Sequence, residues 1–273
     1  MKLNDKTVIV TGAARGIGAA IATRFAQEGA KVVVSDLNED QAIATAEQFG
    51  GLGAACDVTD EAQIKALVEK TESHFGPVDL FCSNAGLYKG EPDHAASAPN
   101  EDWQLCWDVH VMAHVYAARA VLPSMIERGE GYFVQVASAA GLLAQIGDAA
   151  YSATKHAAVS FAESLAISHG DQGIKVSAVC PQYIATELLG YSEADGAKAA
   201  SEHEVLKTPQ ELAESVVKGV EEETFLILPH AEVEQYIQFK AGNYDKWIGA
   251  MRKLRAKALA SGGLRMEDML KVM

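Results

Sequence analysis

The chain has 273 residues, of which 49% are hydrophobic and 22% are charged, an ordinary composition for a globular protein with a sizeable core. Its net charge of −14 has the wrong sign for a protein that binds the phosphate backbone of nucleic acids. The four cysteines form no CxxC pair, so we expect buried free thiols and a reducing, cytoplasmic location. Neither a signal core nor an apolar run of ~20 residues is present, which argues against a membrane association.

Apolar, strand-like runs alternate with helical patterns along most of the chain. Seven runs are expected to form strands: TVIVTG, KVVVSD, AACDV, VDLFCSN, GYFVQVAS, KVSAVCP and TFLIL. Helical patterns lie near 16–28, 38–48, 60–75, 100–127, 150–169 and 208–223. Because the strands are continuous apolar runs, we expect helices on both faces of their sheet. The pattern predicts an α/β fold, a single doubly wound (Rossmann) domain with about seven parallel strands.

Two segments fall outside this alternation. Residues 183–207 combine small and charged residues after a strand, and their length predicts a mobile lid over the substrate. Residues 231–273 are expected to form a helical extension to a main domain over residues 1–230. Aromatic residues spaced to share one face of this extension are Tyr236, Phe239, Tyr244 and Trp247. We expect them to pack on the domain or on a neighbouring subunit rather than to face a ligand.

The sequence TGAARGIG follows the first expected strand and opens the first expected helix. Gly12, Gly16 and Gly18 allow a tight turn and bring the backbone close to a pyrophosphate, which the free N–H groups of the helix would bind. Asp36 ends the second strand, where a carboxylate can accept hydrogen bonds from both hydroxyls of an adenosine ribose and repels a 2′-phosphate. Arg15 is a competing signal, because a guanidinium could hold that phosphate. We therefore predict a dinucleotide site that favours NAD over NADP.

Asp57 ends the third expected strand, and we expect its carboxylate to contact the adenine amino group. The alternative is a cap for the next helix, but Asp60 already fits that position. Asp57 is therefore assigned to the predicted cofactor site.

The sequence YSATK places Tyr151 and Lys155 four residues apart on one face of a predicted helix. A phenol with a pKa of about 10 is a poor base near neutral pH, but a nearby ammonium stabilises the phenolate and lowers that pKa. The positive charge of an oxidised nicotinamide would add to this effect. Ser138 ends the strand GYFVQVAS, where its hydroxyl could donate to a substrate oxygen. These residue types predict acid–base chemistry at that oxygen.

Taken together, these motifs resemble a known family. In the order and spacing of the single-domain short-chain dehydrogenases/reductases, the chain contains TGAARGIG, Asp36, Asp57-Val58, SNAG at 83–86, Ser138, YSATK and the stretch from Pro181 to Thr186. The resemblance covers residues 6–229 and implies an NAD-dependent oxidoreductase that interconverts a secondary alcohol and a ketone. It also implies that Tyr151 is the general acid/base, that Lys155 lowers its pKa and binds the nicotinamide ribose, and that Ser138 polarises the carbonyl.

The resemblance implies further contacts. Additional cofactor contacts are expected from Ile17, Val58, Asn84, Ala85, Gly86, Pro181, Ile184 and Thr186, of which the last two would hold the carboxamide. Besides Ser138 and Tyr151, substrate contacts are expected from Ala140, Gln145, Gln182, Leu188 and Leu189, a set that fits a hydrophobic alcohol only loosely. Gln182 stands where many relatives have glycine, and it either reaches the substrate or fixes the turn. Relatives are commonly tetramers or dimers, so a homo-oligomer is expected.

His110 and His114 lie four residues apart in WDVHVMAH, a spacing that zinc hydrolases use. The glutamate expected after the first histidine is replaced by Val111 and no third ligand is visible, so we predict no metal site. Family members usually have an asparagine at the position of His110, where it helps carry a water chain from the active-site lysine to solvent. An imidazole could replace it, because it exchanges protons near neutral pH. His114 is expected to be a packed or capping residue.

Three alternatives stay open. A dinucleotide-binding protein with impaired catalysis would result if His110 breaks the relay, although the serine, tyrosine and lysine are intact. A sugar-nucleotide epimerase or dehydratase shares Y-x-x-x-K, but the spacing TGxxxGxG and the lack of a carboxy-terminal substrate domain weigh against it. A metallohydrolase built on HVMAH would require a metal, which an assay of the purified protein would detect.

Overall fold

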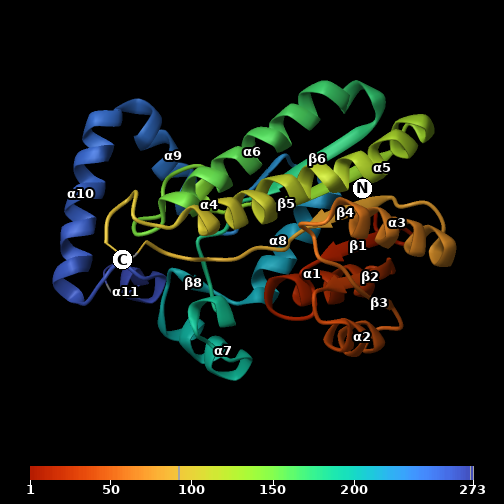
Figure 1. The fold of residues 1–273 in the computed structure, drawn as a ribbon, viewed down its shortest axis with the longest axis horizontal. Helices are drawn as coiled ribbons and strands as arrows, with labels where there is room; N and C mark the ends of the chain where they lie inside the picture. The colour runs from red at the N-terminus through yellow and green to blue at the C-terminus, as the bar shows by residue number, and fades with distance from the viewer. Residues whose placement is uncertain (92, 271, 273) are drawn as a thin grey trace.

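The computed structural model describes residues 1–91, 93–270 and 272 of the chain. Its central sheet has seven parallel strands in the order β3-β2-β1-β4-β5-β6-β9 (Figure 1). In chain order they are β1 (Thr7–Thr11), β2 (Lys31–Asp36), β3 (Leu52–Ala55), β4 (Leu80–Ser83), β5 (Gly131–Val136), β6 (Ile174–Val179) and β9 (Leu226–Ile227). The predicted doubly wound fold is confirmed. One detail differs, because β3 ends at Ala55 and Asp57 lies beyond the strand.

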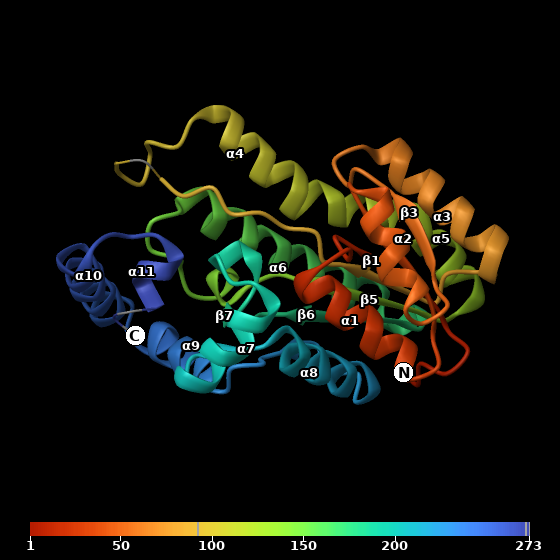
Figure 2. The same ribbon diagram turned by 90° about the horizontal axis from the view of Figure 1, so that it is seen from below.

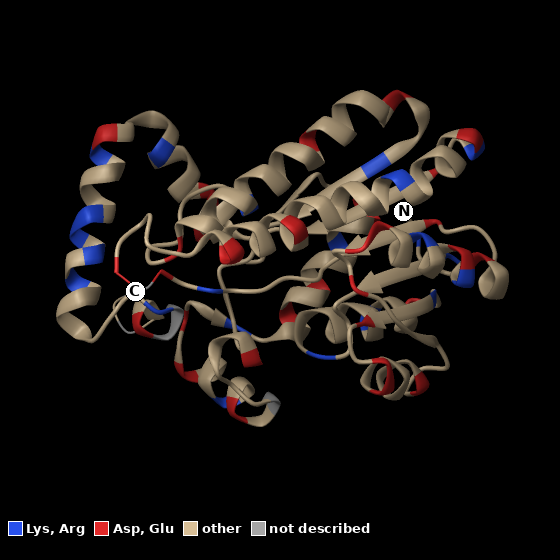
Figure 3. Cartoon of the chain, viewed as in Figure 1, with Lys and Arg blue, Asp and Glu red and all other residues tan. Residues whose placement is uncertain are grey.

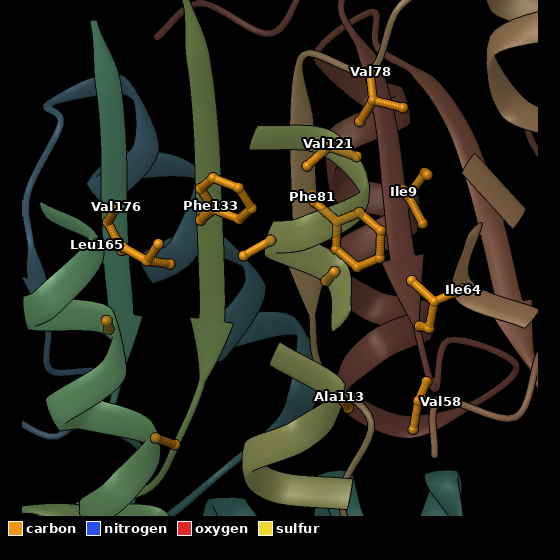
Figure 4. Packing of buried hydrophobic residues seen from close by; sticks show 14 of the residues in the cluster. Ile9, Val58, Ile64, Val78, Phe81, Ala113, Val121, Phe133, Leu165 and Val176 are labelled. Atoms are coloured by element: carbon orange, nitrogen blue, oxygen red, sulfur yellow. The ribbon is translucent and has the colours of Figure 1, made fainter. Parts of the chain in front are cut away.

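Helices cover both faces of this sheet (Figure 2). One face packs against α1 (Gly16–Gln27), α2 (Glu39–Glu47) and α8 (Pro209–Glu221), and the other against α3 (Glu61–Phe75), α5 (Ala113–Arg128) and α6 (Ala149–His169). Successive side chains of a strand point to opposite faces, so Ile9 packs in one core cluster and Val8 and Val10 in the other. Figure 4 shows Ile9, Phe81 and Phe133 of neighbouring strands in the first of these clusters.

The strand order reverses between β1 and β4, which are hydrogen-bonded neighbours. Ligands of open α/β sheets bind beyond the carboxyl ends of the strands at such a switch point. The topology therefore predicts the location of a site beside Thr11 and Ser83, the last residues of these two strands.

The long helix expected near 100–127 consists of three consecutive segments. Between α4 (Asn100–Trp107) and α5 lies a π-helical turn, η1 (Asp108–Met112), which contains His110. A π turn inserts an extra residue into a helix and is frequent at functional sites. Both His110 and His114 are buried, with 0% and 2% of their surface exposed.

The two segments outside the predicted alternation have structure of their own. Within 183–207, β7 (Tyr183–Ile184) pairs with β8 (Leu206–Lys207), and η4 (Glu187–Leu189) and α7 (Glu193–Glu202) lie between them. The sequence did not predict this small second sheet. The extension comprises α9 (Glu232–Gly242), α10 (Tyr244–Ser261) and α11 (Met266–Leu270), which gather at one end of the molecule in both views (Figures 1 and 2). Within the described residues, no helix has the length and apolarity to cross a membrane.

Candidate active site

A cleft of about 1090 Å³ follows the carboxyl ends of the strands. The glycine loop after β1 and the strand ends of β2 and β3 form one end of it, and the extension forms the other. Ser138, Tyr151 and Lys155 lie between them on its lining. The structure brings every site residue predicted from the sequence to this cleft except His110, which lies behind its wall.

The glycine loop has the backbone geometry that an anion site needs. Gly12 and Gly16 adopt positive φ angles of 59° and 58°, which L side chains rarely adopt. A Cβ atom on Gly18 would overlap the carbonyl oxygen of Gly12. Arg15 precedes the first turn of α1 without a side-chain cap, so the first N–H groups of the helix are available to an anion.

Asn84 fixes this loop to the neighbouring strand. Its side-chain amide donates to the carbonyl oxygens of Thr11 and Gly12, both at 2.9 Å, and its backbone N–H donates to the Thr11 hydroxyl at 3.1 Å. The amide is thus engaged by the protein, and it positions the loop.

Acidic residues surround the same end of the cleft. Asp36 accepts a hydrogen bond from the backbone N–H of Ala14 at 3.1 Å, which holds its carboxylate beside the glycine loop. Arg15 forms an ion pair with Glu187 of η4, so this contact joins the glycine loop to the segment 183–207 across the cleft mouth. Both partners are largely exposed, at 68% and 61%.

Asp57 has a local structural role in addition to its place on the cleft. One of its carboxylate oxygens accepts hydrogen bonds from the backbone N–H and the hydroxyl of Thr59, at 2.9 and 2.7 Å. The cap of α3 is Asp60, which accepts from the Ala62 N–H at 2.8 Å. The helix-cap alternative considered for Asp57 is therefore wrong, because Asp60 occupies that position.

The catalytic candidates come from β5 and α6. Lys155 donates from Nζ to the Val136 carbonyl oxygen at 3.1 Å, and this nitrogen lies 5.6 Å from the centre of the Tyr151 ring. Ser138 follows β5, and its Oγ accepts a hydrogen bond from the Ala140 N–H at 3.1 Å. Asp148 is the N-cap of α6 and accepts a hydrogen bond from the Tyr151 N–H at 2.9 Å. The sequence reasoning missed Asp148, although an aspartate just before a predicted helix is a capping signal.

Burial dominates the electrostatics of this group. It raises the pKa of Tyr151 to about 12, against a smaller lowering by the hydrogen bond with Ser138. It also lowers the pKa of Lys155 to about 8. The lowered phenol pKa expected from the sequence is therefore not found in the protein alone. The physical reason is that loss of hydration penalises the phenolate more than the surrounding protein groups stabilise it.

His110 is held by the protein at both ring nitrogens. The Leu87 backbone N–H donates to Nε2 at 3.1 Å, so the ring proton lies on Nδ1, which donates to the Thr154 hydroxyl at 2.9 Å. Burial, with a further contribution from Lys155, lowers the pKa of His110 to about 2. The ring stands edge-on to Tyr151, 5.4 Å between centres. It is a neutral group next to the active site, which differs from the imidazole titrating near neutral pH that the sequence suggested.

His114 is a packed side chain, as expected. Burial lowers its pKa to about 3. Among the described residues, no three His, Cys, Asp or Glu side chains gather into a potential metal-binding group.

The end of the cleft beside the extension includes residues that the sequence did not assign to it. Gln182 lines the cleft, and its backbone N–H donates to His230 Nδ1 at 3.2 Å, a contact that holds the turn after Pro181. Three of the four aromatic residues of the extension, Tyr236, Phe239 and Trp247, line the cleft. The sequence had predicted only that the four aromatic residues pack, and their position on the cleft was not expected. Helical spacing showed that they share a face but not what that face meets.

Comparison with known proteins identifies relatives over most of the chain. Residues 6–197 match the family model of the short chain dehydrogenases. The chain is 34% identical over 226 residues to D-threitol dehydrogenase of Mycolicibacterium smegmatis, covering 79% of this chain and 86% of that protein. It is also 34% identical over 222 residues to cyclohexanol dehydrogenase of Acinetobacter sp., covering 79% and 87%.

Solved structures of dehydrogenases have the same fold as this chain. A short-chain dehydrogenase/reductase from Burkholderia phymatum in complex with NAD has a TM-score of 0.79 at 25% identity, covering 90% of this chain and 96% of that one. A gluconate 5-dehydrogenase from Burkholderia cenocepacia in complex with NADP and tartrate has a TM-score of 0.74 at 25% identity, covering 86% and 97%.

Proposed function

Because this chain belongs to the short-chain dehydrogenase/reductase family, we propose that it is an NAD-dependent oxidoreductase that interconverts a secondary alcohol and a ketone. Members of this family bind nicotinamide dinucleotides, and the two relatives named above are dehydrogenases of alcohols. One observation carries the proposal: a single cleft contains both the glycine loop with Asp36 and the trio Ser138, Tyr151 and Lys155.

The residues of the first end of the cleft fit a dinucleotide. The free N–H groups at the start of α1 suit a pyrophosphate. Gly18 has no Cβ atom, and one would overlap the Gly12 carbonyl oxygen, so glycine at this position allows the loop its conformation. Asp36 favours NAD, because its carboxylate would repel a 2′-phosphate. The charge of Arg15, the competing signal, is compensated by Glu187. A dinucleotide bound there would supply the hydride exchange between the alcohol and the ketone.

In this proposal the chain's own residues handle the proton and the substrate oxygen. Tyr151 takes the hydroxyl proton during oxidation and returns it during reduction. Ser138 accepts a hydrogen bond from the Ala140 N–H at 3.1 Å, and its hydroxyl donates only a long hydrogen bond, of 3.5 Å, to the Pro181 carbonyl oxygen. The hydroxyl would turn from that carbonyl to donate to the substrate oxygen. Lys155 has a pKa lowered to about 8, so it exchanges protons close to neutral pH and can pass them onward.

His110 is assigned a positioning role in this scheme. Its two hydrogen bonds connect Leu87, after β4, to Thr154 of α6, and they hold the cleft wall in place behind Tyr151. The same observation favours the second candidate function, a dinucleotide-binding protein with impaired catalysis. A neutral ring whose nitrogens are both engaged does not carry protons, so it would not replace the amide of the relay.

The division of the chain belongs to the proposal as well. Residues 1–230 would form the catalytic domain, 183–207 a lid that the Arg15–Glu187 ion pair holds over the cleft, and 231–273 the extension. A homo-oligomer is proposed from the resemblance to the family.

The test is a cofactor assay with purified protein, NAD or NADP and a panel of aliphatic and alicyclic secondary alcohols. We expect NAD-dependent turnover that falls by a factor of about 1,000 or more in Tyr151→Phe, which removes the acid/base. Tight NAD binding without turnover, together with a gain of activity in His110→Asn, would instead establish the impaired protein. Equal rates with NADP would show that Asp36 does not select the cofactor.

A further inference from the structure

We propose that the extension forms one wall of the substrate pocket and that this pocket selects a bulky, uncharged, hydrophobic alcohol or ketone over a polyol. The inference rests on the proposed function, because it concerns the substrate of the same cleft. The two relatives named for their substrates act on a polyol and on a cyclic hydrocarbon alcohol, and both are 34% identical to this chain. Sequence identity therefore does not distinguish between these two substrate classes, so the inference is drawn from the residues that line the pocket.

The wall is apolar along its length. Side chains of the extension that line the cleft include Tyr236, Phe239, Trp247, Met251, Leu254 and Met269. On α10, Trp247, Met251 and Leu254 follow one another at intervals of four and three residues, which places them on one helical face. The cleft lining also includes the apolar side chains of Ile146, Leu188 and Leu189.

Charged groups are absent from this wall within the described residues. The charged side chains that line the cleft are Arg15, Asp36, Asp57, Lys155 and Glu187, and none comes from the extension. The basic residues of α10, in contrast, are exposed, and Figure 3 shows them spaced along that helix. A substrate carboxylate or phosphate would therefore find no counter-charge on this wall, and burying it there would be costly.

The extension is fixed to the loop that leads into the catalytic helix. Lys240 of α9 donates from Nζ to the carbonyl oxygens of Leu142 and Leu143, at 2.7 and 3.0 Å, and lies 5.0 Å from the centre of the Trp247 ring. At the other end of the loop, Gly147 lies so close to Leu264 that a Cβ atom would overlap its carbonyl oxygen. These two contacts preorganise the wall, so an apolar ligand need not order it on binding.

The wall reaches the reacting group itself. Tyr151 belongs to the same buried apolar cluster as Met269, Leu270 and Val272. A substrate whose oxygen meets Ser138 and Tyr151 would thus place its carbon skeleton against the extension. Each methylene in such a pocket increases selectivity by a factor of about 10–200, whereas hydroxyls that face the apolar side chains of the extension lose their hydration.

The experiment compares two probes, decalol (a saturated bicyclic secondary alcohol) and D-threitol, by calorimetric titration of the protein with NADH present, so that the alcohol binds without turnover. We expect decalol to bind at least about tenfold more tightly than D-threitol. Met251→Trp fills the pocket and should weaken decalol binding by about tenfold or more, with Leu254→Trp as a second variant. Leu259→Trp is the matched control on the same helix, because Leu259 is exposed, and it should change binding less than about twofold.

The outcomes separate this inference from the proposed function. If D-threitol binds more tightly than decalol and is turned over, the inference is wrong but the proposed oxidoreductase function is supported. Unchanged decalol binding in correctly folded Met251→Trp and Leu254→Trp would show that the extension is not the wall. Decalol binding that these variants weaken, without turnover of any alcohol in the panel, would support the pocket and contradict the proposed function.

Discussion

The two ends of the cleft are built in different ways. At the end proposed for the cofactor, the lining residues follow directly after parallel strands, and the backbone itself forms the site through glycines and the start of a helix. The end proposed for the substrate combines the loop before α6, the segment 183–207 and the extension, which are far apart in the sequence. The first end is therefore specified locally, whereas the second exists only when distant segments pack together.

The comparison is tested most strongly by two glycine substitutions. Gly18→Ala would force a Cβ atom into the Gly12 carbonyl and should weaken NADH binding by about 100-fold or more, because the loop cannot close on the pyrophosphate. Gly147→Ala would push the backbone of Leu264 away and should raise the KM for decalol about tenfold while NADH binding stays within about twofold. Calorimetry with NADH and initial rates with decalol measure the two effects.

Gly50→Ala is the control for both glycine substitutions. Gly50 has a positive φ of 72°, but an added Cβ atom would meet nothing within 4 Å. It should destabilise the protein slightly without changing either binding constant. If Gly18→Ala and Gly147→Ala each weaken NADH binding and raise the KM for decalol to the same extent, the two ends of the cleft are not separate units.

Acid stability should depend on two buried histidines, His110 of η1 and His114 of α5. The pKa values of His110 and His114 are lowered to about 2 and about 3, so the folded protein keeps both neutral. Their contribution to stability is present above pH ~6.5 and is lost as the pH falls, because the unfolded chain then binds protons that the folded one does not. Each histidine adds up to about 1.4 kcal/mol per pH unit to this loss.

His114→Leu isolates one of these contributions. Urea unfolding between pH 7 and pH 5 should show a shallower decrease of the unfolding free energy in this variant than in the unchanged protein, by up to about 1–2 kcal/mol at pH 5. Identical pH dependence in the two proteins would mean that His114 is solvated or charged in the folded state.

The smallest expected effect concerns the Lys240 clamp, the pair of hydrogen bonds by which Lys240 holds the extension to the loop before α6. Lys240→Met keeps an unbranched side chain of similar length but removes the hydrogen bonds to Leu142 and Leu143. The KM for decalol should rise by about three- to tenfold, with NADH binding unchanged, because only the substrate wall loosens. Lys253→Met, at an exposed position of α10, is the control in the same rate measurements. A parallel loss of NADH affinity would argue that the clamp supports the whole cleft.

Much of the fold could be predicted from local patterns. All seven strands were recognised, since continuous apolar runs are typical of strands covered on both faces. The glycine loop, Asp36 and the YSATK helix were placed correctly on the cleft, because strand ends of a parallel sheet meet at one edge. The π-helical turn at Asp108–Met112 was not predicted, since no local signal distinguishes it from the helices on either side.

The sequence by itself determined the doubly wound sheet, the family and the residues at the carboxyl ends of its strands, because each depends on spacing within a short stretch of chain. Tertiary structure alone decided three further points. It turned Tyr236, Phe239 and Trp247 toward the cleft, it engaged both nitrogens of His110, and it raised the pKa of Tyr151 to about 12. All three depend on burial and on contacts between distant segments, which periodicity along the chain does not encode.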